Sequence, residues 1–168
     1  MIVLAVDPAV RNTGYAVVQA LEGGKFRALD YGVISVPARH KQSVALATVR
    51  RTLADLITRW NPHEVAVEGI IYVQSSRTAI SMGAARAATM IAAADQELRT
   101  YEYAPKKVKK AVVGNGSADK QQVAFMVRVL LGLAENPPHD AADALAIGLA
   151  HHYATDPLKS TLIERREI

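Results

Sequence analysis

Four carboxylates occupy positions in the sequence where a hydrophobic core would not usually place them. Asp7 ends the apolar run 2–6, and Glu68 lies within the apolar stretch 65–70. Asp140 and Asp143 are three residues apart, so they share one face of an expected helix, and the residues that follow them are almost all apolar. A buried carboxylate costs free energy unless it is paired or binds a metal ion, so these acids are candidates for chemistry.

Acids drawn to one place repel one another, and the repulsion raises their pKa values. Two divalent cations about 3.5–4 Å apart would relieve that repulsion and would form a centre for phosphoryl transfer. Ligation by oxygen alone favours Mg²⁺ or Mn²⁺ over zinc. We therefore predict a catalytic site with two such ions, Mg²⁺ (or Mn²⁺), held by Asp7, Glu68, Asp140 and Asp143.

Each acid taken alone also fits a structural role. Asp7 directly before a proline suits a turn, and Glu68 would be satisfied on an outward strand face or beside an arginine. Asp140 and Asp143 suit a helix N-terminus, which would also keep them ionised and available to a metal. His139 is a metal ligand, a residue that supports one, or a surface loop residue. The four acids together are harder to explain by structure alone.

The acids need a scaffold that brings distant segments together, and the pattern of apolar runs predicts one. Three runs with short connections predict an antiparallel meander, and two later runs predict strands reached through helices. The expected strands are 2–6, 15–19, 26–36, 64–70 and 100–104; the expected helices are 40–60, 77–98, 105–113, one capped by Ser117 that runs to about residue 133, and 140 to about 154. This order predicts an α/β fold with a mixed five-stranded sheet, antiparallel strands followed by parallel ones, and helices on both faces.

Composition limits the size and class of the molecule. A chain of 168 residues, half of them hydrophobic, suits one globular domain, which we place at 1–156, followed by a polar, flexible C-terminal tail at 157–168. The absence of cysteine excludes disulfide scaffolds, thiolate zinc sites and cysteine nucleophiles. The first residues lack a signal-peptide pattern, and no apolar run approaches the roughly 18 residues of a membrane span, so we expect a cytoplasmic protein.

Basic residues gather after the last expected strand, and the net charge of +4 fits a polyanionic partner. No acid interrupts the sequence between Glu102 and Asp119, and the lysines there and just beyond are Lys106, Lys107, Lys109, Lys110 and Lys120. Arg77 and Arg86 flank the Glu68 side. We predict that the first four lysines and Arg77 bind a nucleic-acid backbone and that Lys120 stabilises charge during catalysis. Lysines at this density also occur on ordinary solvated faces.

Short blocks spread from residue 1 to about residue 153 form a series in a fixed order. They are Ala5-Val6-Asp7-Pro8, Thr13-Gly14-Tyr15, Ala66-Val67-Glu68, Tyr103-Ala104, Val108-Lys109, the run 112–120 and the run 140–146. Each block is common by itself. In this order and spacing they resemble the RuvC-type Holliday junction resolvases, which have the RNase H-like fold.

The resemblance implies a homodimeric endonuclease that binds four-way (Holliday) DNA junctions and cuts two strands of like polarity symmetrically, in homologous recombination and DNA repair. The four acids match the family's metal-binding catalytic acids, and Lys109 and Lys120 match its lysines near the scissile phosphate. The products would be ligatable nicks with 5′-phosphates. The RuvA–RuvB branch-migration complex would be a partner.

Two positions depart from familiar members of the family. Those carry a Phe three residues after the catalytic Glu, where it stacks on a junction base; here Ile71 stands there and Tyr72 follows. We predict that Tyr72 takes over the stacking, with an aliphatic wedge at Ile71 as the alternative. Some members carry His where this chain has Asp140, and the neighbouring His139 leaves room for variation in the ligands.

The dimer has one candidate interface in the sequence. A stripe of small residues on the expected helix 77–98 would let two helices approach closely; it consists of Met82, Ala85, Thr89, Ala92 and Ala93. Packing of the same helix on the sheet explains these residues equally well.

Three other functions compete with junction cleavage. A YqgF-type nuclease would share Asp7 and the strand order, but the segment 114–120 and the pair Asp140 and Asp143 favour the RuvC type. An ATP-binding domain of the actin and sugar-kinase class would share the meander, but Ala9 departs from its phosphate loop, and 168 residues leave no room for its second domain. A non-catalytic DNA-binding module would have no use for clustered acids.

Overall fold

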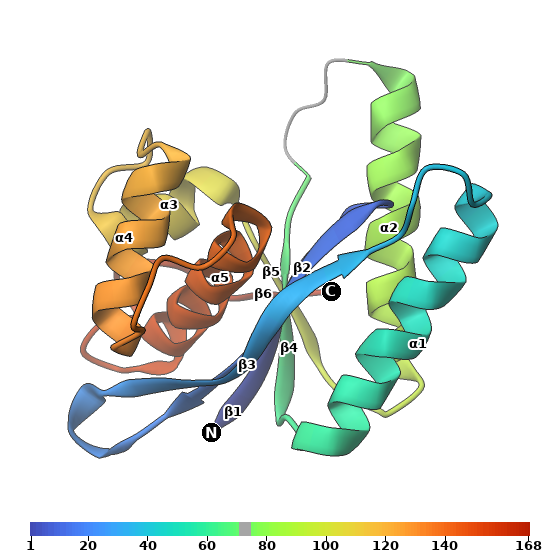
Figure 1. Cartoon of the computed structure of the whole chain (residues 1–168). Coiled ribbons are helices and arrows are strands. Elements are labelled where there is room, and N and C mark those ends of the chain that lie inside the picture. Colours follow the sequence, from blue (N-terminus) through green and yellow to red (C-terminus); the bar gives the residue numbers. More distant parts are fainter. Residues whose placement is uncertain (71–74) are drawn as a thin grey trace.

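The computed structural model describes residues 1–70 and 75–168. They form one six-stranded sheet in the order β3-β2-β1-β4-β5-β6, with helices on both faces (Figure 1). The strands are β1 (Ile2–Asp7), β2 (Asn12–Ala20), β3 (Phe26–Ser35), β4 (Glu64–Glu68), β5 (Thr100–Tyr103) and β6 (Arg166–Glu167). The helices are α1 (Gln42–Trp60), α2 (Ser76–Ala94), α3 (Pro105–Val113), α4 (Lys120–Leu131) and α5 (His139–Thr155), with a short 3₁₀ turn at Glu22–Gly24.

The order and direction of the strands follow the sequence pattern. β1, β2 and β3 form the expected antiparallel meander. β4 then pairs in parallel with β1, and β5 pairs in parallel with β4, because a helix carries the chain back before each of these strands. The predicted mixed sheet with helices on both faces is confirmed.

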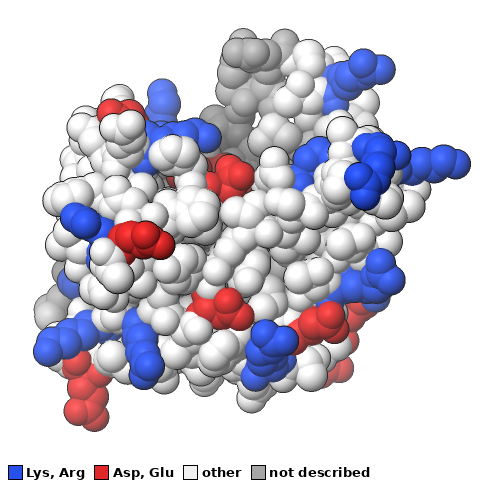
Figure 2. Space-filling view, viewed as in Figure 1, with Lys and Arg blue, Asp and Glu red and all other residues white. Residues whose placement is uncertain are grey.

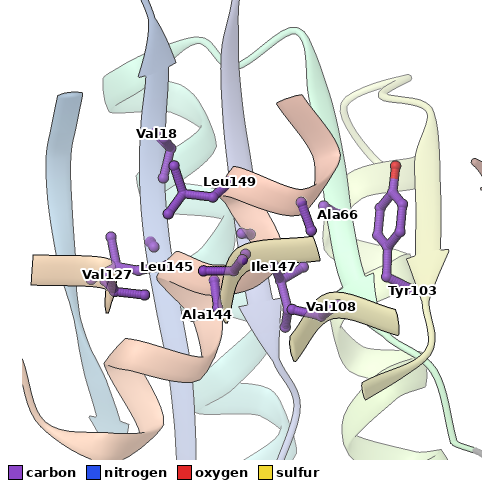
Figure 3. Close-up of a cluster of buried hydrophobic side chains, with 14 of the residues drawn as sticks. Val18, Ala66, Tyr103, Val108, Val127, Ala144, Leu145, Ile147 and Leu149 are labelled. Carbon is purple, nitrogen blue, oxygen red and sulfur yellow. The ribbon is translucent and has the colours of Figure 1, made fainter. Parts of the chain in front are cut away.

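Two hydrophobic clusters hold the helices on the sheet. α1 and α2 cover one face, and α3, α4 and α5 cover the other (Figure 1). In the second cluster, Leu149 of α5 lies beside Val18 of β2 (Figure 3). α5 approaches the strand so closely that a Cβ atom on Gly148 would lie 2.8 Å from Val18 Cγ2. None of the helices in residues 1–70 and 75–168 combines the length and hydrophobicity that a membrane-spanning segment requires.

The sheet has six strands rather than the five expected, because the C-terminal tail supplies β6. Arg166 and Glu167 pair with β5, and Ile163 just before them is 3% exposed. The sequence pattern did not predict this strand, because it is two residues long and both residues are charged. The domain limits at 1–156 and the flexibility of the tail stay predictions.

The cap of α4 also differs from the expectation. Asp119, not Ser117, is the N-cap: its carboxylate accepts a hydrogen bond from the Gln122 backbone N–H, and the Gln122 side chain accepts one from the Asp119 N–H, both at 2.9 Å. This reciprocal pair satisfies two backbone donors at once, so it is preferred over a single serine cap.

The stripe of small residues on α2 faces inward. Ala85, Thr89, Ala92 and Ala93 are buried under α1 and the sheet, and only Met82 is partly exposed. Packing within the chain therefore explains the stripe, and the prediction that it forms a dimer interface is wrong for its buried members.

Candidate active site

Two of the predicted acids end neighbouring parallel strands. Asp7 is the last residue of β1 and Glu68 the last residue of β4, and the register pairs Val6 with Val67 directly before them. Parallel strands end at the same edge of a sheet, so these two carboxylates lie at one edge. Buried strands lead up to both acids and hold their backbones in place.

The first turns of α5 bring the other two acids to this edge. Asp140 and Asp143 lie near the start of the helix, which packs along β1 and β2. Gly14, which pairs with Asp7 across the β1–β2 ladder, touches the helix: a Cβ atom there would lie 1.9 Å from the Asp140 carbonyl oxygen. Only glycine therefore lets α5 begin beside Asp7. The expected strand 15–19 left Gly14 outside it, whereas β2 begins at Asn12 and includes Gly14, and a glycine inside a strand marks close approach of another backbone.

The electrostatics of the four acids show that they form one group. Burial, followed by the charge of Asp143, raises the pKa of Asp7 to about 6. Burial, followed by the charges of Asp7 and Asp143, raises the pKa of Glu68 to about 8. The pKa of Asp143 is also raised, by burial first and in part by Asp140. The structure thus brings together the acids that the sequence singled out, at positions up to 136 residues apart.

Two lysines and a histidine lie close enough to the acids to lower their pKa values. Lys109 is half-buried, and its Nζ donates a hydrogen bond to the Ala118 carbonyl oxygen at 2.9 Å. Its charge opposes the rise in the pKa of Glu68 and Asp143. Lys120, the first residue of α4, likewise opposes the rise in the pKa of Asp7 and Asp143. His139 opposes the rise in the pKa of Asp143. Figure 2 shows Asp or Glu atoms in a hollow of the face drawn there, with Lys or Arg atoms on both sides. The surroundings of Asp7, Glu68, Asp140 and Asp143 are called the recess below.

Comparison with known proteins identifies the family in which this arrangement occurs. A sequence profile described as crossover junction endodeoxyribonuclease RuvC matches residues 3–151. The chain belongs to the RuvC family. A RuvC of Akkermansia muciniphila is 58% identical over 168 residues, which cover 100% of both chains.

Solved structures agree with this membership. The fold matches Thermus thermophilus RuvC in complex with Holliday junction substrate, with a TM-score of 0.89 and 31% identity over 99% of each chain. The yeast mitochondrial Holliday junction resolvase Ydc2 shares the fold, with a TM-score of 0.61 over 88% of this chain and 77% of the other, at 15% identity. The predicted family and RNase H-like fold are confirmed.

The predicted metal centre fits the donors in the recess. Membership in the RuvC nuclease family implies the use of divalent metal ions. The donors are carboxylate oxygens whose charges repel one another, and a hard divalent cation would remove that repulsion. Among residues 1–70 and 75–168, no three His, Asp or Glu side chains are already arranged as a metal-binding cluster.

The other predicted DNA contacts are spread more widely than the acids. Lys106, Lys107 and Lys110 are all exposed on α3, and Lys107 Nζ lies 4.0 Å from Glu164 Oε2 of the tail. Arg77 lines a groove of about 550 Å³ beside the recess, together with Arg11 and Asp140.

Two further arginines lie near the recess but bond to other groups of the protein. Arg11 is already engaged, because its guanidinium donates hydrogen bonds to the carbonyl oxygens of Pro37 and His40. Arg86, expected to flank the Glu68 side, pairs with Glu102 of β5 at 2.6 Å, and Glu102 Oε2 lies 3.5 Å from the Cβ position of Gly69, directly after Glu68. Tyr72 and Ile71, the candidates for base stacking, lie outside the described residues.

Proposed function

We propose that the recess hydrolyses phosphodiester bonds in four-way DNA junctions, with Asp7, Glu68, Asp140 and Asp143 as ligands of two Mg²⁺ or Mn²⁺ ions. The observation that carries the proposal is the convergence of four carboxylates at the ends of β1, β4 and the start of α5, in a chain of the RuvC family. Such ions, when bound, supply Lewis acidity that makes water a better nucleophile and stabilises the leaving 3′-oxygen. Hydrolysis in this direction leaves 5′-phosphates.

Side chains of the protein would bind the cations and stabilise the charge that develops on the phosphate. Asp7 has Asp143 and Glu68 among its nearest charged neighbours, so it would hold divalent cations together with both of them. Lys120 and Lys109 lie close enough to the acids to change their pKa values, so each would also stabilise negative charge building up on a phosphate in the recess. His139 would act as a ligand or support one beside Asp143.

Junction DNA would extend from the recess over both flanks. The lysines of α3 (Lys106, Lys107, Lys109 and Lys110) and Arg77 beside the groove would bind phosphates, and Tyr72 would stack on a base. The structure of the relative from Thermus thermophilus was solved in complex with Holliday junction substrate, which supports four-way junction DNA as the substrate of this chain. The family likeness also supports a cytoplasmic location and the RuvA–RuvB complex as a partner.

Symmetric cutting of a junction would need two copies of the site. An apolar groove of about 340 Å³ on the outer side of α1 and α2 is lined by Leu46, Ala47, Ala84, Ala87, Ala88, Ile91 and the stem of Arg50. Ile91 is 49% exposed there, which is costly for a large aliphatic side chain. A second copy of the chain would cover this surface in the homodimer.

Cleavage of a synthetic four-way junction tests the proposal. The full chain should cut two opposed strands of the junction in Mg²⁺ or Mn²⁺, leave a duplex of the same sequence intact, and cut neither in EDTA. A chain that binds the junction yet cuts no strand with either cation would overturn the proposal in favour of a non-catalytic DNA-binding protein. Equal cutting of duplex and junction would contradict the selectivity for junctions but would leave the nuclease activity in place.

A further inference from the structure

β4 carries a second glutamate, Glu64, at the end opposite Glu68. Glu64 is 5% exposed and lies against His151 of α5, which is 0% exposed. His151 Nε2 is 2.8 Å from Glu64 Oε2, and Tyr103 Oη of β5 is 2.9 Å from His151 Nδ1. Arg165 of the tail closes the cluster, since its Nη2 lies 2.9 and 2.8 Å from the two Glu64 oxygens.

The protonation states give every hydrogen bond in this cluster a direction. Burial works against the charged form of Glu64, but hydrogen bonds from His151 and Arg165 outweigh it and hold the pKa of Glu64 below its usual value. Burial lowers the pKa of His151 to about 4, so the imidazole is neutral at pH 7. His151 Nε2–H therefore donates to the Glu64 carboxylate, and Nδ1 accepts from the Tyr103 hydroxyl.

The cluster lies at nearly the same distance from the catalytic acids along β4 as along α5. β4 advances about 13 Å from Glu64 to Glu68 at ~3.3 Å per residue. α5 advances about 12 Å from Asp143 to His151 at ~1.5 Å per residue. β5 joins the same arrangement, because its Tyr103 pairs with Glu68 in the sheet while its hydroxyl reaches His151. A direct link between β4 and α5 at the rear thus fixes how the front ends of these elements face each other.

We propose that Glu64 and His151 are positioning residues whose hydrogen bond, clamped by Tyr103 and by Arg165 of the C-terminal tail, sets the spacing between Glu68 and Asp143 and so the affinity of the site for divalent cations. A cation held by both acids needs them at a defined separation, and a link at the rear that holds β4 against α5 sets that separation before the cation binds. This role rests on the proposed cation site and deepens it.

The tail takes part through more than a single contact. The Arg165 guanidinium carbon lies 4.0 Å from the centre of the Tyr101 ring, and β6 directly after it pairs with β5. The Arg165 side chain is 30% exposed, so removing it leaves a smaller defect than removing Glu64. The tail therefore secures a buried pair that connects two elements of the active site.

His152 provides a matched control in the same helix. It is 3% exposed and bonds to the Val18 carbonyl oxygen of β2 at 3.0 Å, so it ties α5 to β2 and not to β4. The experiment compares Glu64→Gln, Tyr103→Phe and Arg165→Ala with His152→Gln in the full chain. Mn²⁺ binding to the DNA-free protein is measured by electron paramagnetic resonance, and the melting temperature of each variant is measured alongside.

We expect Glu64→Gln to weaken Mn²⁺ binding about tenfold, Arg165→Ala and Tyr103→Phe to weaken it less, and Arg165→Lys to restore part of the loss. His152→Gln should leave Mn²⁺ affinity within about twofold at a comparable loss of melting temperature, because its link does not reach β4. Affinity that follows melting temperature alike in all variants, or that stays unchanged in Tyr103→Phe and Arg165→Ala, would overturn the positioning role. A wild-type chain that binds no Mn²⁺ would overturn the proposed function together with this role.

Discussion

Two glutamates of one short strand, Glu64 and Glu68, have opposite electrostatic states. Both lie on β4, four residues apart, and burial disfavours the charge of each. The pKa of Glu64 is held below its usual value, whereas that of Glu68 is raised to about 8. The difference lies in the neighbours: donors surround Glu64, and other carboxylates surround Glu68. Balanced charge marks the structural end of the strand, and unbalanced charge marks the end that would bind cations.

The same contrast runs along α5. Its start carries Asp140 and Asp143 into the group of repelling acids, while His151 near its end is fully hydrogen-bonded and neutral. The chain thus supports a self-repelling site on elements that are well satisfied elsewhere. The free-energy cost of the acids is tolerated because the rest of the core is closely packed.

The largest expected effect comes from the unbalanced end. Asp7→Asn should lower junction cleavage by about 10³-fold or more, because it removes a carboxylate that would hold the cations at the centre of the site. Junction binding should remain, since the phosphate-binding lysines are untouched. Single-turnover cleavage and a binding assay in Ca²⁺ measure the two effects. An Asp7→Asn chain that still cuts in Mg²⁺ would remove the contrast on which the site assignment rests.

The balanced end should respond in stability. Glu64→Gln should reduce the free energy of unfolding by about 2 kcal/mol, because the hydrogen bonds from His151 and Arg165 lose their charged acceptor. Urea denaturation monitored by circular dichroism measures this change. Arg99→Ala is the control: its guanidinium is 3.4 Å from Glu64 Oε1 but the side chain is 65% exposed, so its removal should cost less than about 1 kcal/mol. Equal losses would mean that Glu64 is stabilised mainly from the surface.

The sequence was sufficient to predict most of the fold and the identity of the acids. Apolar runs mark the meander and both parallel strands, and an acid at the end of such a run, as at Asp7, is rare enough to be noticed. β6 was missed because two charged residues carry no periodicity, and its pairing with β5 depends on contacts over 60 residues away in sequence.

The supporting residues of the site were harder to predict than the acids. Gly14 could be recognised as a family motif but not as the point where α5 meets β2, since that contact needs the three-dimensional arrangement. Glu64 and His151 are 87 residues apart, and each alone resembles an ordinary polar residue. Arg86 was expected on the Glu68 side, but its pairing with Glu102 was not, because sequence does not show which acid an arginine will meet.

The pH dependence of stability should separate the two glutamates further. An unfolded Glu has a pKa near 4.5, whereas folded Glu68 has one of about 8 and Asp7 one of about 6. Between pH 4.5 and 8 the folded state binds more protons, so the metal-free protein should lose stability as pH rises through this window. Glu68→Gln should remove much of the loss and stabilise the metal-free chain by about 2 kcal/mol at pH 8, but little at pH 4.5.

Urea denaturation in EDTA at several pH values measures this profile. Added Mg²⁺ should stabilise the wild type at pH 8 and should stabilise Glu68→Gln less. A metal-free wild type whose stability rises from pH 5 to pH 8 would mean that the acids are satisfied within the protein, as Glu64 is.

The smallest expected effects come from single exposed basic side chains that would bind DNA phosphates. Lys110 is exposed on α3, and its replacement by Ala should reduce junction affinity a few-fold and reduce the salt dependence of binding by about one counterion, since one phosphate contact is lost. Arg99→Ala, which removes an equally positive group next to Glu64, should change neither quantity. Fluorescence anisotropy with a labelled junction at several salt concentrations compares the two. If the two variants lose the same salt dependence, the positive charge attracts DNA over the whole molecule, and the lysines of α3 form no defined path to the acids.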